Sequence, residues 1–278
     1  MYKTIVVHVS PGPGAANTHS VAAGLANAMS AHLVGATVSG VIELNYLIAG
    51  GAPLMMMPAI EADVLRTDAE QRLTAFAQFC SAQGVASCET RLLDTTAAEG
   101  MLLQSRYCDL LVAGRDDVAE HGLLMPARLP GYLVTQSTRP VLLVPPTGKF
   151  DGKFGTVMVA WNGSPGASRA IAFALPLLRR AGKVLVTVCN ADLERVDMGA
   201  EPGADLATYL SRHNANVEVV QADTNEETGS ALCALARERH ADLIVAGAFG
   251  HSRLHDWVLG GTTASLIDQA PVPLLMSH

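Results

Sequence analysis

Residues 109–114, DLLVAG, return 133 residues later as residues 242–247, DLIVAG. The same offset carries residues 140–143, PVLL, onto residues 273–276, PLLM. A third match, of residues 4–9 (TIVVHV) with 156–161 (TVMVAW), has a larger offset, which predicts 19 extra residues in the first half, within 41–62. The chain therefore reads as a duplication of one unit. We expect domains at residues 1–147 and 153–278, with the boundary in the Pro, Gly and Lys-rich stretch 145–153.

Each half alternates short apolar runs with longer amphipathic ones, which is typical of βαβ units. In the second half the strands are expected at residues 156–161, 184–189, 217–221, 242–247 and 273–276. The DLLVAG and DLIVAG segments are apolar at consecutive positions, so helices should cover both faces of these strands. The sequence thus predicts an α/β fold of two doubly wound, five-stranded parallel-sheet domains, Rossmann-like in type.

Local signals place the helices of the second half. Ser164 is a suitable N-cap with Pro165 at the first helical position, and Pro176 should kink or end that helix. A further helix is expected over residues 229–240. The last strands of the two halves, residues 141–144 and 274–276, should lie at sheet edges, where the halves could pair with each other as a built-in dimer. Association between chains is left open.

Composition narrows the classes of partner. A net charge of −7 without a local Lys or Arg run gives no field for a nucleic acid backbone. The five cysteines have no C-x-x-C spacing and are interpreted as reduced core residues. Neither a secretory signal nor about 20 consecutive apolar residues is found, so we expect a cytoplasmic protein without a membrane partner.

A glycine-bracketed loop follows the DLIVAG strand. Gly247 and Gly250 are followed by nine residues and then by Gly260, Gly261 and Thr262, which open an apolar helix pattern. Glycine lets main-chain N–H groups approach an anion closely, and the start of a helix adds the positive end of its dipole. Because ligands of doubly wound sheets lie beyond the carboxyl ends of the strands, phosphate is the expected guest.

The spacing G-x-x-G, nine residues, then G closely resembles the ATP-binding members of the universal stress protein family, in its tandem form. The resemblance extends over both halves and includes residues 159–164 and 271–276. It implies an adenine nucleotide alpha hydrolase-like fold and an ATP site, with or without Mg²⁺, in a protein that senses or regulates a stress response. The residues it implies for nucleotide binding are Ala160, Trp161, Asn162, Val188, Gly247, Gly250, Arg253, Gly260, Gly261 and Thr262.

Several positions depart from the family pattern. Asn162 replaces an acid at the end of the first strand, and Gly261 stands where a Ser, Thr or Asn side chain would bond phosphate. Both changes predict weaker binding. In the first half, Gly114 is followed by Arg115-Asp116-Asp117, without a second glycine and with carboxylates at the phosphate position, so we expect that half to bind no nucleotide.

Two alternatives stay open. One is a slow ATP hydrolase, for which the candidates near the loop are His251, His255 and Asp256. The other is an interaction scaffold that binds no nucleotide; the Met-containing segment 44–60 could serve a partner, although packing on its own domain is the simpler interpretation. No catalytic or metal-ligating residue is assigned.

Overall fold

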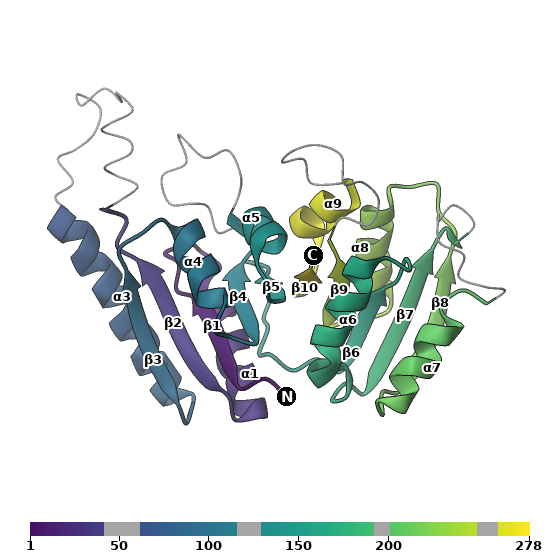
Figure 1. Ribbon diagram of the computed structural model, residues 1–278, viewed down its shortest axis with the longest axis horizontal. Helices are drawn as coiled ribbons and strands as arrows, with labels where there is room; N and C mark the ends of the chain where they lie inside the picture. Colours follow the sequence, from purple (N-terminus) through teal and green to yellow (C-terminus); the bar gives the residue numbers. More distant parts are fainter. Residues whose placement is uncertain (42–61, 116–128, 192–200, 249–260) are drawn as a thin grey trace, which may run out of the picture.

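A computed structural model describes residues 1–41, 62–115, 129–191, 201–248 and 261–278. Within these ranges a ten-stranded sheet runs in the order β3-β2-β1-β4-β5-β10-β9-β6-β7-β8 (Figure 1). The elements of the first half are β1 (Thr4–His8), α1 (Ala15–Met29), β2 (His32–Val38), α3 (Ala62–Ala82), β3 (Cys88–Leu93), α4 (Ala97–Ser105), β4 (Leu110–Gly114), α5 (Leu129–Gln136) and β5 (Val141–Val144). Those of the second half are β6 (Thr156–Ala160), α6 (Pro165–Leu178), β7 (Lys183–Cys189), α7 (Ala204–Arg212), β8 (Val217–Ala222), α8 (Thr228–Glu238), β9 (Leu243–Gly247), α9 (Gly261–Gln269) and β10 (Leu274–Ser277).

The two halves repeat one parallel topology and join through their last strands. Every strand pair within a half is parallel, whereas β5 and β10 pair antiparallel with Leu142 opposite Leu275. The α/β fold with two five-stranded parallel halves is thus confirmed, and so is the pairing of the halves with each other. Their edges merge into one sheet, so neither inner edge is left open.

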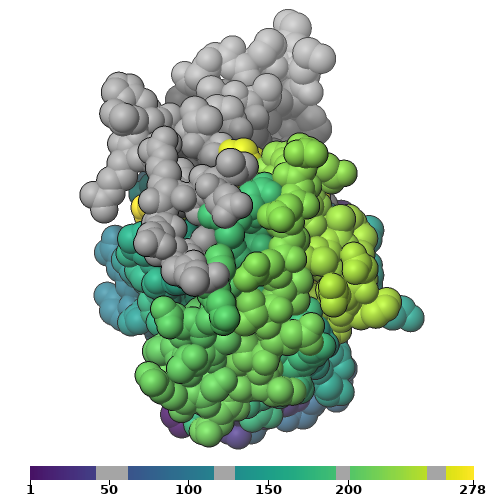
Figure 2. All heavy atoms as spheres, turned by 90° about the vertical axis from the view of Figure 1, so that its right-hand side faces the viewer, coloured from purple at the N-terminus to yellow at the C-terminus, as the bar shows by residue number. Residues whose placement is uncertain are grey.

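Helices cover both faces of the sheet, as the consecutive apolar runs predicted. One apolar cluster holds side chains from α1, α3, α6 and α7, and the other holds side chains from α4, α5, α8 and α9. Each cluster contains residues of both halves. Viewed from the β8 end, the surface consists mostly of second-half residues, and first-half colours are visible only near the margins (Figure 2).

The repeated aspartate has the same role in both halves. Asp109 Oδ2 accepts hydrogen bonds from the main-chain N–H groups of Lys3 (2.6 Å) and Thr4 (3.0 Å). Asp242 Oδ2 accepts one from Thr156 (2.8 Å). A carboxylate acceptor strengthens such bonds, so each aspartate fastens the first strand of its half to the strand that it precedes. The repeated sequence therefore conserves a hydrogen-bonding role of its aspartate within the chain as well as a strand.

The connection between the halves packs closely on α1. Asn17 Nδ2 donates to the carbonyls of Pro145, Pro146 and Gly148 at 3.1 to 3.2 Å. A Cβ atom at Gly24 would lie 1.8 Å from the main-chain oxygen of Asp151, so only glycine permits this approach. The stretch expected as a boundary is therefore held against the first half.

Two local expectations met different outcomes. Ser164 caps α6, because its side chain accepts a hydrogen bond from Ala167 N (3.1 Å), and Pro165 begins the helix as predicted. Pro176 does not end α6, which continues to Leu178. The main-chain bond from Arg179 N to Leu175 O (3.0 Å) continues the helical pattern past Pro176, and the buried Leu177 and Leu178 hold the last residues in the core.

Candidate functional site

The candidate site lies at the carboxyl ends of β6 and β9, the neighbouring strands at which the order of the second half reverses. Ala160, the last residue of β6, pairs with Ala246, which precedes Gly247 at the end of β9. The structure thus brings together Ala160, Trp161, Asn162 and Gly247. Ligands of doubly wound sheets bind at such a switch point.

Some of the hydrogen-bonding groups in the turn from β6 to α6 are already paired within the protein. Trp161 N donates to Thr187 O (2.9 Å), which extends the pairing with β7. Asn162 Oδ1 accepts from Ser164 N (3.2 Å), and Gly163 adopts a positive φ of 70°. Within the described residues, the Nδ2 group of Asn162 has no hydrogen-bond partner. It can donate to a ligand hydroxyl, whereas its oxygen already serves the turn.

Gly247 has a packing role that the sequence did not reveal. A Cβ atom there would lie 2.3 Å from Ala167 N and 2.6 Å from the carbonyl carbon of Gly166. A Cβ atom at Gly166 would in turn lie 2.8 Å from Ala248 O. The first turn of α6 is thus pressed against the end of β9 by a pair of glycines. Gly247 is required by this contact, whatever else it does.

Val188, the next-to-last residue of β7, has a buried side chain. It lies in β7, pairs with Gln221 of β8 and is 1% exposed. Its side chain packs against the left-handed turn at Gly203. A contact with a ligand would therefore involve main-chain atoms.

Helix α9 begins with residues that have small side chains, Gly261 and Thr262. Gly261 is its first residue, and Gly261 and Thr262 are exposed. Among the described residues, a Cβ atom at Gly261 would meet only Glu227 Oε1, at 4.0 Å. The first N–H groups of a helix have no acceptor within it. The predicted residues Gly250, Arg253 and Gly260, with His251, His255 and Asp256, lie outside the described residues.

Glu227 is a carboxylate beside this helix that sequence reasoning did not single out. It caps α8 by accepting from the main-chain N–H groups of Gly229 (3.0 Å) and Ser230 (2.9 Å). Burial opposes its ionisation, but these bonds, with those of the Ser230 and Ser265 hydroxyls, hold the pKa of Glu227 below its usual value. The amino end of α9 therefore has a fixed negative charge nearby, which counteracts its attraction for an anion.

The first half presents different side chains at the equivalent positions. In each half of the sheet, a row of paired residues crosses the strands on one face, which is covered by α4 and α5 in the first half and by α8 and α9 in the second. The second-half row is Ala246, Ala160, Thr187 and Val220, and the first-half row is His8, Ala36 and Arg91. His8 is 1% exposed, so an imidazole ring fills space where Ala160 has only a methyl group.

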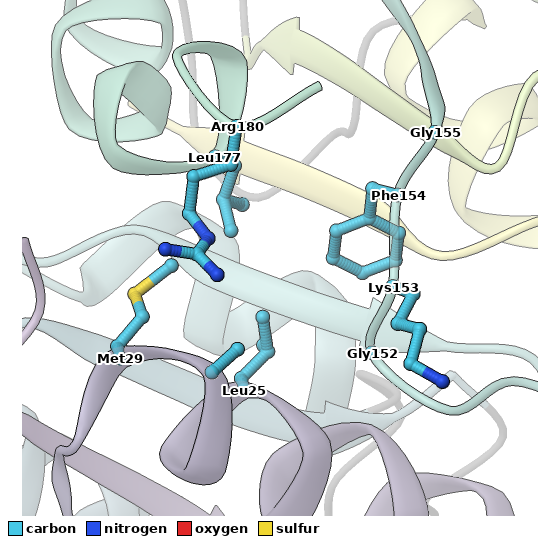
Figure 3. A pocket seen from close by; sticks show the side chains of 9 residues that line it. Leu25, Met29, Gly152, Lys153, Phe154, Gly155, Leu177 and Arg180 are labelled. Atoms are coloured by element: carbon cyan, nitrogen blue, oxygen red, sulfur yellow. The ribbon is translucent and has the colours of Figure 1, made fainter. Parts of the chain in front are cut away.

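A cavity of about 230 Å³ lies away from this site, between α1, the connection and α6 (Figure 3). Its walls include Leu25, Met29 and Leu177, and Arg180 points into it while Lys153 points away. Both flanking helices end here, and a cation near helix C-termini is stabilised by their dipoles. Helix packing accounts for this arrangement.

Among the described residues, His, Cys, Asp and Glu side chains form no group of three that could hold a metal ion. The five cysteines are free thiols; Cys80, Cys108, Cys189 and Cys233 are buried, as expected for core residues, whereas Cys88 is half-buried. Burial raises the pKa of Cys108 and of Cys80 to about 12, which keeps both protonated. None of the described helices is long and apolar enough to cross a membrane.

Comparisons with known proteins agree with this fold. A universal stress protein from Archaeoglobus fulgidus DSM 4304 superposes with a TM-score of 0.72 at 17% identity, covering 99% of this chain and 95% of that one. A putative universal stress protein from Pseudomonas aeruginosa UCBPP-PA14 gives 0.60 at 12% identity, with 99% and 93% covered. A search of curated proteins found no match.

The family model described as "Universal stress protein family" matches residues 153–278, the half that contains β6 to β10. The first half shares the topology of that half, and the structural matches extend over both. Residues 153–278 therefore belong to the universal stress protein family, and the first half repeats the topology of that half in tandem.

Proposed function

We propose that the second half binds one adenine nucleotide, ATP, in a protein of tandem form with domains at residues 1–147 and 153–278. The base and ribose lie near the β6–α6 turn and the main chain of Val188, and the phosphates lie at the amino end of α9. Arg253 and the glycines at 250 and 260 belong to the same proposal. Such a protein senses or regulates through its bound state, in the cytoplasm, and the first half provides the scaffold.

The observation that carries the proposal is the exposed amino end of α9, which begins with the small residues Gly261 and Thr262. Gly261 leaves its N–H group approachable, and Thr262 is exposed with a hydroxyl able to donate to a phosphate oxygen. The glycine spacing supports the same placement. Glu227 works against it, because its carboxylate lies near the position of the phosphates. We therefore expect weak binding, and expect Mg²⁺ to help by neutralising phosphate charge.

Titration calorimetry with ATP tests the proposal, with and without Mg²⁺. One site per chain is expected, and Gly261→Glu should remove it by adding a second carboxylate to the amino end of α9. Thr208→Glu adds the same charge on an exposed position of α7 and should leave binding unchanged. Two sites per chain would refute the assignment to one half. No binding at millimolar ATP would leave the scaffold interpretation, and ADP formed over hours would indicate hydrolysis.

A further inference from the structure

Arg115 connects the first half to the helix at the candidate site. It directly follows β4 and occupies the place that Ala248 has after β9. Its side-chain Nη1 donates to Ala270 O at 2.6 Å, immediately beyond the last residue of α9. Its main-chain N–H donates to Val144 O at 2.8 Å, which fixes its backbone to β5 beside the junction of the halves. The guanidinium thus crosses the junction of the halves, while the backbone of Arg115 is hydrogen-bonded to its own half.

The contact suits the chemistry of a helix end. The last carbonyl groups of a helix lack partners within it and carry partial negative charge, so a guanidinium there both satisfies an acceptor and complements the dipole. A hydrogen bond from a charged donor is among the stronger ones. Arg115 is also half-buried, which limits screening by solvent.

In the part of the chain that the structure describes, the second half has no equivalent of the Arg115 contact with Ala270. Ala248, at the equivalent place in the second half, has a methyl group and cannot donate to the end of α5. At the same end of α9, Arg237 of α8 approaches Gln269 O, but at 3.5 Å and from an exposed position. Helices α5 and α9 lie side by side above the junction (Figure 1). The firm contact therefore runs from the first half to α9.

We propose that Arg115 is a positioning residue through which the first half holds α9 in place for a phosphate group. The proposal has two parts: that Arg115 holds α9 in place, and that this helps α9 bind a phosphate group. Only the second part rests on the proposed function. The residue that follows β4 in the first half, where a phosphate loop was expected to have degenerated, thus serves the site of the other half. The scaffold role of the first half then has a defined point of action.

Hydrogen exchange of the whole chain, followed by mass spectrometry, tests the first part without any ligand. In Arg115→Met the amides of α9 should exchange about tenfold faster, since a charge-assisted hydrogen bond is lost while the apolar stem is kept. Arg115→Lys should restore part of the protection. Arg237→Met is the matched control and should change the rate by less than about twofold. Equal effects of the two Met variants, or unchanged exchange in Arg115→Met, would overturn the inference.

ATP titration of the same variants tests the second part. Apparent affinity falls with the fraction of molecules in the competent state, so Arg115→Met should weaken binding about threefold or more and Arg237→Met should not. If α9 loosens but ATP binds equally well, the role of Arg115 in the site is overturned. If the unaltered chain binds no ATP, the proposed function fails, and the exchange data still decide whether Arg115 holds α9.

Discussion

Replacing Gly247 by alanine separates the packing role of this glycine from a ligand role. The added Cβ atom would lie 2.3 Å from Ala167 N and 2.8 Å from Ala167 Cα. Both are main-chain atoms at the start of α6, and no side-chain rotation can relieve the overlap. The helix must move away from β9 by roughly 1 Å, which disrupts packing on a buried strand. Overpacking of this kind costs about 1 to 3 kcal/mol.

Urea unfolding measures the effect. With a slope of about 2 to 3 kcal/mol per M, a loss of about 2 kcal/mol lowers the midpoint by roughly 0.7 to 1 M. Gly261→Ala is the matched control, because no described residue lies closer than 4.0 Å to the new Cβ atom. Its midpoint should stay or rise. A Gly247→Ala midpoint within about 0.2 M of the unaltered protein would refute the reasoning.

Three further predictions concern single side chains. Glu227→Gln should lower the free energy of unfolding by about 1 kcal/mol, because the α8 cap loses its charge. Since the folded pKa of Glu227 is lowered, this contribution is present above about pH 4.5 and is lost as the pH falls through the folded pKa. Urea midpoints between about pH 3 and 7 measure it. Burial, and then the charge of Asp109, raise the pKa of Tyr2, so the free energy of unfolding should fall as the pH rises above about 10. This fall should be smaller in Tyr2→Phe. The control Tyr107→Phe, at an exposed position, should behave as the unaltered chain. Asp242→Asn should lower the free energy of unfolding by about 1 kcal/mol, because a neutral acceptor replaces a charged one, and thermal unfolding at neutral pH would detect it.

The sequence predicted the features of the fold that follow from local periodicity and from the repeat. The apolar runs located the strands of the second half to within about two residues, which is the uncertainty of strand ends by hydrogen-bond criteria. Ser164 and Pro165 identified the start of α6, because capping depends on adjacent residues. The expectation that the two final strands lie at sheet edges indicated that the halves could pair there, as β5 and β10 do.

The candidate site was only partly predictable. The need for glycine at 247 depends on Gly166 and Ala167, which are distant in sequence and meet β9 only after α6 has packed. Glu227 looked like an ordinary solvated acid, and its position beside α9 depends on the packing of α8. Arg115 could be noted as a departure from a glycine pattern, but its bond to Ala270 crosses the junction of the halves. Contacts of this range leave no periodic signal in the chain.

The antiparallel junction of β5 and β10 lies within a single polypeptide, so its formation is independent of protein concentration. A dimer of identical subunits separates on dilution, and every substitution in it occurs twice, once on each side of its axis. Here the partner is tethered at a high effective concentration, and each side of the seam can change without the other. The two halves can therefore have different residues at equivalent positions, such as His8 where the second half has Ala160 and Arg115 where it has Ala248. Two copies of one fold can thus differ in function while they share a continuous core.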